Sequence, residues 1–202
     1  MLRTLPLALL AVPAVVSAAP AQDLALVQQH LRAVSSMTAN FTQSSGGQTL
    51  TGTLQLKRPG RVRFQYGRGT NMLLVSDGKA LTFIDYDVKQ VQRYPIGDNP
   101  LSILLNPNQD IARFAKVVPG TAGGALLVEA RDPKRPEYGT ITMAFARVPS
   151  APAGLMLQGW SVVDAQGRRT TIKLSNQRFN VPVAESAFRW TDPRASARGP
   201  RG

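Results

Sequence analysis

One arginine lies on the apolar face of a predicted strand. In the stretch LQLKRP, residues 54–59, Leu54 and Leu56 share one face, and the period of two places Arg58 next on that face. A guanidinium stays charged at any workable pH, and burying it is costly unless another group pairs with it. The pattern thus offers a charged hydrogen-bond donor beside an apolar surface. The alternative is that Arg58, just before Pro59, turns outward to water at the rim of the sheet.

No constellation typical of an enzyme is present in the sequence. It has no G-x-S-x-G elbow, no H-E-x-x-H motif, no P-loop, no dinucleotide fingerprint, no cysteine and a single histidine, His30. Asp85 and Asp87 fall in a predicted turn, and Asp132 and Glu137 flank a basic loop, where solvated carboxylates are common. His30 has no obvious partner and is predicted to lie at the surface without a role. We therefore expect a binding protein, with no catalytic residue, metal or cofactor.

The composition is that of one globular domain with a basic balance. The chain has 202 residues, of which 43% are hydrophobic and 18% charged, and its net charge is +12. A basic surface can indicate nucleic acid, but an exported chain does not meet nucleic acid, and we expect none as partner. Anionic lipid headgroups or an acidic protein fit export better, and a merely solvated basic face is a further alternative.

The first residues are typical of a secretory signal. Arg3 precedes an apolar run over 5–16, which is too short for a permanent membrane anchor, and small residues follow. We expect a signal peptide over 1–21, cleaved after Ala18 or Ala21, one domain over 22–193, and a disordered basic tail over 194–202. The alternative is an uncleaved anchor. The absence of cysteine excludes a lipid-anchored N-terminus, so the mature protein is predicted to be soluble and periplasmic.

Hydrophobic periodicity predicts one helix followed by a long antiparallel meander. Residues 23–34 carry an apolar stripe at helical spacing, and alternation then follows along most of the chain. Asp77-Gly78 is the strongest hairpin signal. The predicted strands are 37–42, 50–57, 61–66, 72–76, 80–85, 90–94, 125–130, 140–146, 155–163 and 169–179, with a last short strand at 188–190.

Two more short amphipathic helices are predicted in the middle of this pattern. One begins near Asn99, with Leu101, Leu104 and Leu105 on one side, and the other begins at Asp110. The second would carry Ile111, Phe114 and Ala115 on one face. About ten strands must curl or close, and three one-sided helices can cover only one concave face or one mouth. Such a fold leaves an apolar hollow; the alternative is an ordinary packed α+β domain.

Four stretches, in order along the chain, resemble one family. VSDGKALTFIDYDVKQV (75–91) resembles the hairpin signature of the LolA family of periplasmic outer-membrane lipoprotein carriers. LQLKRP (54–59) resembles the family's K-R-P strand end, NPLSILL (99–105) its lid helix and MTANFTQ (37–43) its first strand. The resemblance runs from about Leu24 to Phe188. The related LolB family shares the fold but consists of lipoproteins, so the lack of cysteine favours the soluble carrier.

The resemblance implies a mainly β (α+β) fold, an incomplete antiparallel β-barrel of about 10–11 strands with a lid of three short helices over a hydrophobic cavity. The arginine of K-R-P corresponds to Arg58, which is implied to hydrogen-bond the lid backbone and hold the empty cavity shut. Val62 stands where the family usually has an aromatic residue. The residues expected to form the cavity and lid are Leu24, Val27, Leu31, Leu54, Leu56, Val62, Phe64, Leu101, Leu104, Leu105 and Phe114.

The same resemblance implies the partners. The clients would be triacylated lipoproteins, received from an inner-membrane ABC lipoprotein-release transporter and delivered to an outer-membrane LolB-type receptor, by a carrier that we expect to be a monomer. The alternative function is an exported carrier or sensor of another amphiphile, such as a glycolipid, on the same fold.

Overall fold

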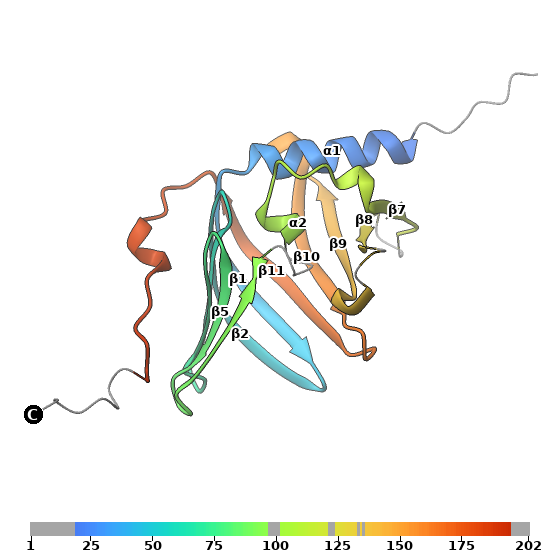
Figure 1. Ribbon diagram of the computed structural model, residues 1–202. Helices are drawn as coiled ribbons and strands as arrows, with labels where there is room; N and C mark the ends of the chain where they lie inside the picture. Colours follow the sequence, from blue (N-terminus) through green and yellow to red (C-terminus); the bar gives the residue numbers. More distant parts are fainter. Residues whose placement is uncertain (1–18, 97–101, 121–123, 133, 135, 195–202) are drawn as a thin grey trace, which may run out of the picture.

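A computed structural model describes residues 19–96, 102–120, 124–132, 134 and 136–194 (Figure 1). The predicted signal peptide therefore lies outside the described residues as far as residue 18, as do Leu101 and the tail beyond Arg194. Nothing in the structure tests the expected cleavage sites.

The described residues form one antiparallel sheet of eleven strands. The order in the sheet is β6-β5-β4-β3-β2-β1-β11-β10-β9-β8-β7, so β6 and β7 are its two edges and the sheet does not close. The prediction of a mainly β, incomplete barrel of about 10–11 strands is confirmed. The strands are β1 (Ser36–Ser45), β2 (Gln48–Lys57), β3 (Arg61–Tyr66), β4 (Met72–Asp77), β5 (Ala80–Asp85), β6 (Gln90–Pro95), β7 (Ala115–Val118), β8 (Leu126–Ala130), β9 (Thr140–Arg147), β10 (Leu155–Val163) and β11 (Arg169–Phe179).

Strict alternation along β1 to β3 produces the apolar inner face. Leu54 pairs with Ala39 on one side and Phe64 on the other, and all three are buried. At Gly52 the strand passes under the Phe41 ring. A Cβ there would lie 2.6 Å from the nearest ring atom and 2.2 Å from a backbone oxygen, so only glycine fits.

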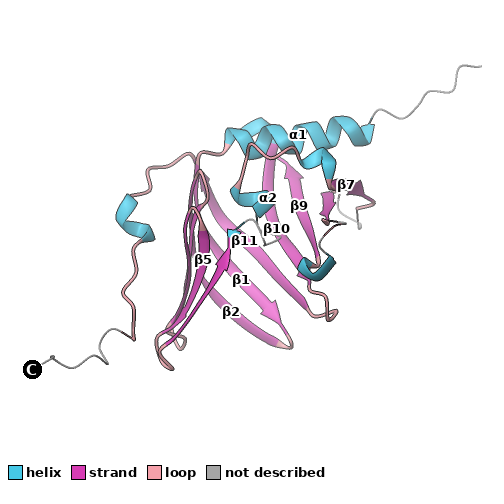
Figure 2. Cartoon of the chain, viewed as in Figure 1, coloured by secondary structure: helices cyan, strands magenta, loops and turns pink. Residues whose placement is uncertain are grey.

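Two α-helices lie against this inner face at one end of the curved sheet (Figures 1 and 2). They are α1 (Ala19–Ala33) and α2 (Ser102–Leu105). The predicted third helix is wrong: its residues form only the 3-10 turn η2 (Ile111–Arg113), and Ala115 already begins β7. The physical reason is competition. Hydrogen bonding of β7 to β8, which also contains the β-branched Val117, outweighs one helical turn. We call α1 and residues 102–113 the lid.

The end of the described chain packs on the opposite, outer face of the sheet. The predicted strand at 188–190 is wrong, because the chain there forms the 3-10 turn η5 (Glu185–Phe188) and then continues without pairing. Val183 and Phe188 bury themselves against Leu73, Val75 and Ile84 of β4 and β5 in a second, smaller core. We call residues 180–190 the strap. The remaining 3-10 turns are η3 (Pro136–Tyr138) and η4 (Pro152–Gly154).

Candidate ligand-binding pocket

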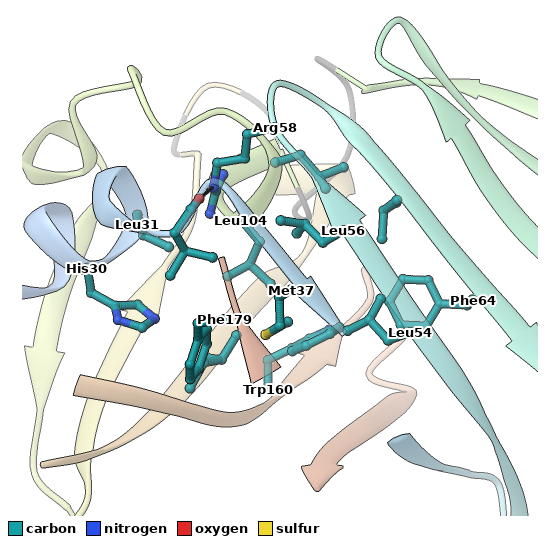
Figure 3. Close-up of a pocket in the computed structure, with 14 residues that line it drawn as sticks. His30, Leu31, Met37, Leu54, Leu56, Arg58, Phe64, Leu104, Trp160 and Phe179 are labelled. Atoms are coloured by element: carbon teal, nitrogen blue, oxygen red, sulfur yellow. Dashed lines mark hydrogen bonds between the residues drawn. The ribbon is translucent and has the colours of Figure 1, made fainter. Parts of the chain in front are cut away.

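An apolar pocket lies between the lid and the inner face of the sheet (Figure 3). Its walls come from α1, α2 and strands β1, β2, β3, β10 and β11 together with the residues that flank them. The lining residues are His30, Leu31, Val34, Met37, Leu54, Leu56, Arg58, Val62, Phe64, Leu104, Leu105, Leu157, Trp160 and Phe179.

The pocket is nearly collapsed in this structure. Its cavity volume is about 30 Å³, which is about the share of one water molecule in the liquid. Pockets that hold small organic ligands have volumes of about 300–1,000 Å³. The structure is therefore a closed state, and an acyl chain could enter only if the lid moved away from the sheet.

The pocket brings together eight of the twelve residues that the sequence singled out. Val27 is fully buried and Leu24 partly buried, but both pack in the core beside the pocket and do not line it. Phe114 lies beyond η2, beside the edge strand β7, because the predicted helix that would have turned it inward does not form. Leu101 is outside the described residues. The eight that line the pocket are Leu31, Leu54, Leu56, Arg58, Val62, Phe64, Leu104 and Leu105.

The Arg58 side chain turns into the pocket and not outward to water. Its Nε donates a hydrogen bond of 2.7 Å to the carbonyl oxygen of Val34, just past the C-terminal end of α1. Its backbone N–H donates to the Ser35 carbonyl at 2.9 Å. The last carbonyls of a helix have no partner within the helix. Arg58 thus supplies donors where α1 ends and the chain enters β1.

Electrostatics make this contact unusual. Burial lowers the pKa of the Arg58 guanidinium to about 10, so it remains protonated at neutral pH. One guanidinium nitrogen, NH1, is buried and has no hydrogen-bond partner among the described residues. A buried charged group of this kind is held at a cost, which the Val34 hydrogen bond offsets only while the lid stays in place.

The lid is joined internally and to the sheet by a few polar contacts. The Gln28 side chain on α1 donates to the Pro107 carbonyl at 3.0 Å and accepts from the Ile111 N–H at 3.1 Å, so the lid's two parts are tied together. The Gly60 N–H donates to the carbonyl of Leu105 at the end of α2, at 3.1 Å. Arg58 and Gly60, on either side of Pro59, therefore hold the ends of both lid helices.

Sequence reasoning missed six of the lining residues. Met37 and Trp160 alternate correctly in predicted strands, and Val34 belongs to the predicted helical stripe, so their signals were present. The surface prediction for His30 is wrong, since its exposed fraction is 2%. His30 lies three residues after Val27 and four before Val34, and this spacing would have placed it on the buried stripe. The missed residues are His30, Val34, Met37, Leu157, Trp160 and Phe179.

An open antiparallel half-barrel with a helical lid over an apolar pocket defines the class: proteins that can enclose an apolar ligand. Comparison with known families agrees. Residues 32–191 match the family model described as outer membrane lipoprotein carrier protein LolA. The chain belongs to the LolA family.

Individual relatives cover nearly the whole chain. The outer-membrane lipoprotein carrier protein of Chromobacterium violaceum is 29% identical over 189 residues, 88% of each chain. That of Bordetella avium is 29% identical over 202 residues, 95% of this chain and 93% of the relative. Among solved structures, a LolA superfamily protein from Nitrosomonas europaea is similar with a TM-score of 0.49 and 8% identity, covering 85% of this chain and 98% of that one.

One further finding concerns membranes. Among the described residues, no helix is both long and apolar enough to cross a lipid bilayer.

Proposed function

We propose that this protein is a periplasmic lipoprotein carrier, which shields the acyl chains of a lipoprotein in the pocket beneath its lid. The observation that carries the proposal is the pocket itself: eleven apolar side chains in a LolA-family half-barrel, closed by a lid that few polar contacts hold. No group that touches the pocket is arranged for catalysis, and the proposal assigns it a binding role only.

Acyl chains require such a lid in water. Burying one CH₂ group is worth roughly 0.8 kcal/mol, so a sixteen-carbon chain is worth about 12 kcal/mol. A carrier must supply most of this burial to take the chain from a membrane. It must also release the chain, which is easier if the empty protein gains other contacts when it closes.

Arg58 is proposed to supply those closing contacts. When the lid is shut, the guanidinium bonds the Val34 carbonyl and Gly60 bonds Leu105. When acyl chains occupy the pocket, these contacts are lost and burial of the chains replaces them. Closure of the empty state then offsets part of the lost burial and favours release.

The proposed partners follow from this cycle. Triacylated lipoproteins would be received from an inner-membrane ABC transporter and passed to a LolB-type receptor at the outer membrane. The carrier would work as a monomer. The names of the relatives support the lipoprotein clients; the transporter and the receptor are inferred from the need to load and unload the carrier.

The direct test is extraction from a membrane. Purified empty protein is incubated with energised inner-membrane vesicles that contain a triacylated lipoprotein, and the supernatant is examined for a one-to-one complex by native mass spectrometry. We expect a soluble complex with wild type. A periplasmic preparation that carried a glycolipid instead, with no lipoprotein released from the vesicles, would show that the fold serves another amphiphile.

A further inference from the structure

Besides Arg58, one other ionisable side chain lines the pocket in the described part of the chain. His30 lies on α1 with an exposed fraction of 2%, and its Nδ1 is 2.8 Å from the carbonyl oxygen of Pro152 in η4. A carbonyl oxygen only accepts, so Nδ1 carries the proton. The contact joins the lid to the loop between β9 and β10, far along the sheet from the ends that Arg58 and Gly60 hold.

The surroundings of His30 allow only its neutral form. The ring meets Phe145 of β9 at 5.6 Å and Phe179 of β11 at 5.8 Å, both edge to face. Desolvation by burial lowers the pKa of His30, and the Arg58 charge lowers it further, while the hydrogen bond to Pro152 acts in the opposite direction. Figure 3 shows His30 and Arg58 in the same pocket, which no carboxylate lines.

Other charged groups on the elements around His30 lie away from its ring. Arg32 of α1, Arg147 of β9 and Arg178 of β11 are exposed. Asp23, one end of an ion pair with Arg147, lies near the N-terminal end of α1. No acid is therefore placed to stabilise an imidazolium in the closed pocket.

We propose that His30 is a positioning residue for the carrier cycle: as a neutral Nδ1–H donor to Pro152, it fastens the middle of α1 to the sheet, and its protonation opens the lid. The inference rests on the proposed function for its biological meaning, but its test does not require a lipoprotein. Opening hydrates the ring, and the open state then binds a proton that the closed state excludes.

The direction of the pH dependence follows from linkage. The pKa of His30 is lowered in the closed state and is near its ordinary value of about 6.5 in the open state. The stability of the closed state is fully present above about pH 6.5 and falls as the pH drops toward the lowered value. In that window, the opening equilibrium rises up to about tenfold per pH unit.

The test measures the affinity of an uncharged apolar probe, N-phenyl-1-naphthylamine, between pH 5 and pH 8. Wild type should bind the probe more tightly as the pH falls below about 6.5, up to about tenfold per unit. His30→Asn places an amide where Nδ1 lies and cannot titrate, so it should bind at all pH values as wild type does at pH 8. His30→Gln, whose amide reaches only the Nε2 position, should bind roughly 2- to 10-fold more tightly at pH 8 and without pH dependence.

Two results would overturn the proposal. If His30→Asn keeps the wild-type pH profile, another group controls opening. If His30→Gln binds the probe as wild type does at pH 8, the Pro152 contact does not hold the lid. Urea unfolding of each variant at pH 8 checks that all are folded. Because the probe replaces the lipoprotein, failure of this experiment is distinguishable from failure of membrane extraction.

Discussion

The two faces of the sheet are covered in different ways. On the inner face, the lid packs with apolar side chains around a small cavity, and its polar fastenings are single hydrogen bonds to backbone carbonyls. On the outer face, the strap packs around a compact core without such a cavity among its contacts, and ionic contacts surround it.

The strap is held mainly by exposed charges. Glu185 pairs with Lys57 at 2.6 Å and with Arg61, and Arg63 donates to the carbonyls of Ala187 and Arg189 at 3.1 Å each. Exposed ion pairs are weak and are screened by salt. Fastenings of the lid are buried, so each is worth more while intact and each depends on the lid's position. The comparison indicates that the lid is the cover built to move, and that the strap stays in place.

The largest effect is expected from the shared inner wall. Leu54 is 2% exposed and lines the pocket from β2. Leu54→Ala removes packing from both the core and the cavity, and we expect it to lower the free energy of unfolding by about 2–5 kcal/mol. Urea unfolding measures this. Val91→Ala, in the partly buried edge of the strap's core, is the matched control and should cost clearly less; equal losses would show that the two cores do not differ.

Arg58→Leu should shift the balance between closed and open states without unfolding the protein. The closed lid loses a charged hydrogen bond worth about 1.5–3 kcal/mol, and the pocket gains apolar surface. A total of roughly 2–4 kcal/mol corresponds to about 30- to 1,000-fold in the loading equilibrium. We expect a variant that loads well and delivers poorly to the receptor.

Arg58→Lys is the control for this substitution. One ammonium cannot reproduce the planar guanidinium, so its defect should be milder. Transfer of lipoprotein from loaded carrier to receptor is the measurement. Wild-type transfer by Arg58→Leu, at equal stability, would mean that the arginine does not hold the lid.

The smallest effect is expected at Glu185. Lys57, by a side-chain hydrogen bond, and Arg61 hold the pKa of the Glu185 carboxyl below its usual value. A lowered pKa means that its contribution is present above the ordinary range of glutamate and is lost as the pH falls through the lowered value. Glu185→Gln should therefore loosen only the strap, and more so at low salt. Limited proteolysis at the strap reports this, while probe binding in the pocket should not change.

Much of this architecture could be predicted from the sequence, because period-two alternation and turn residues are local signals. The Asp77-Gly78 hairpin, the Leu54–Leu56 inner face and the placement of Arg58 all follow from spacing. The turn at residues 111–113 could not be predicted, since its helical pattern is real but the pairing of β7 with β8 decides its structure. Tertiary pairing of this kind leaves no local signal.

The same limit explains His30 and the strap. A lone histidine shows its partner only when Pro152, 122 residues away, is brought beside it. The F-R-W stretch alternates like a strand, but the neighbouring edges of the sheet are already paired, so Phe188 packs on the outer face instead. In both cases the deciding contact lies between distant parts of the chain.

The chain contains two tryptophans, one on each side of the sheet, and they allow the most direct test of the account. Trp160 lines the pocket, and Trp190 packs against the core beneath the strap. Trp160→Phe and Trp190→Phe each leave a single fluorophore. Both variants are loaded with a lipoprotein whose acyl chains carry bromine, which quenches only at short range. The account predicts strong quenching of Trp160 and none of Trp190; quenching of Trp190 with Trp160 unaffected would place the acyl chains outside the pocket and contradict it.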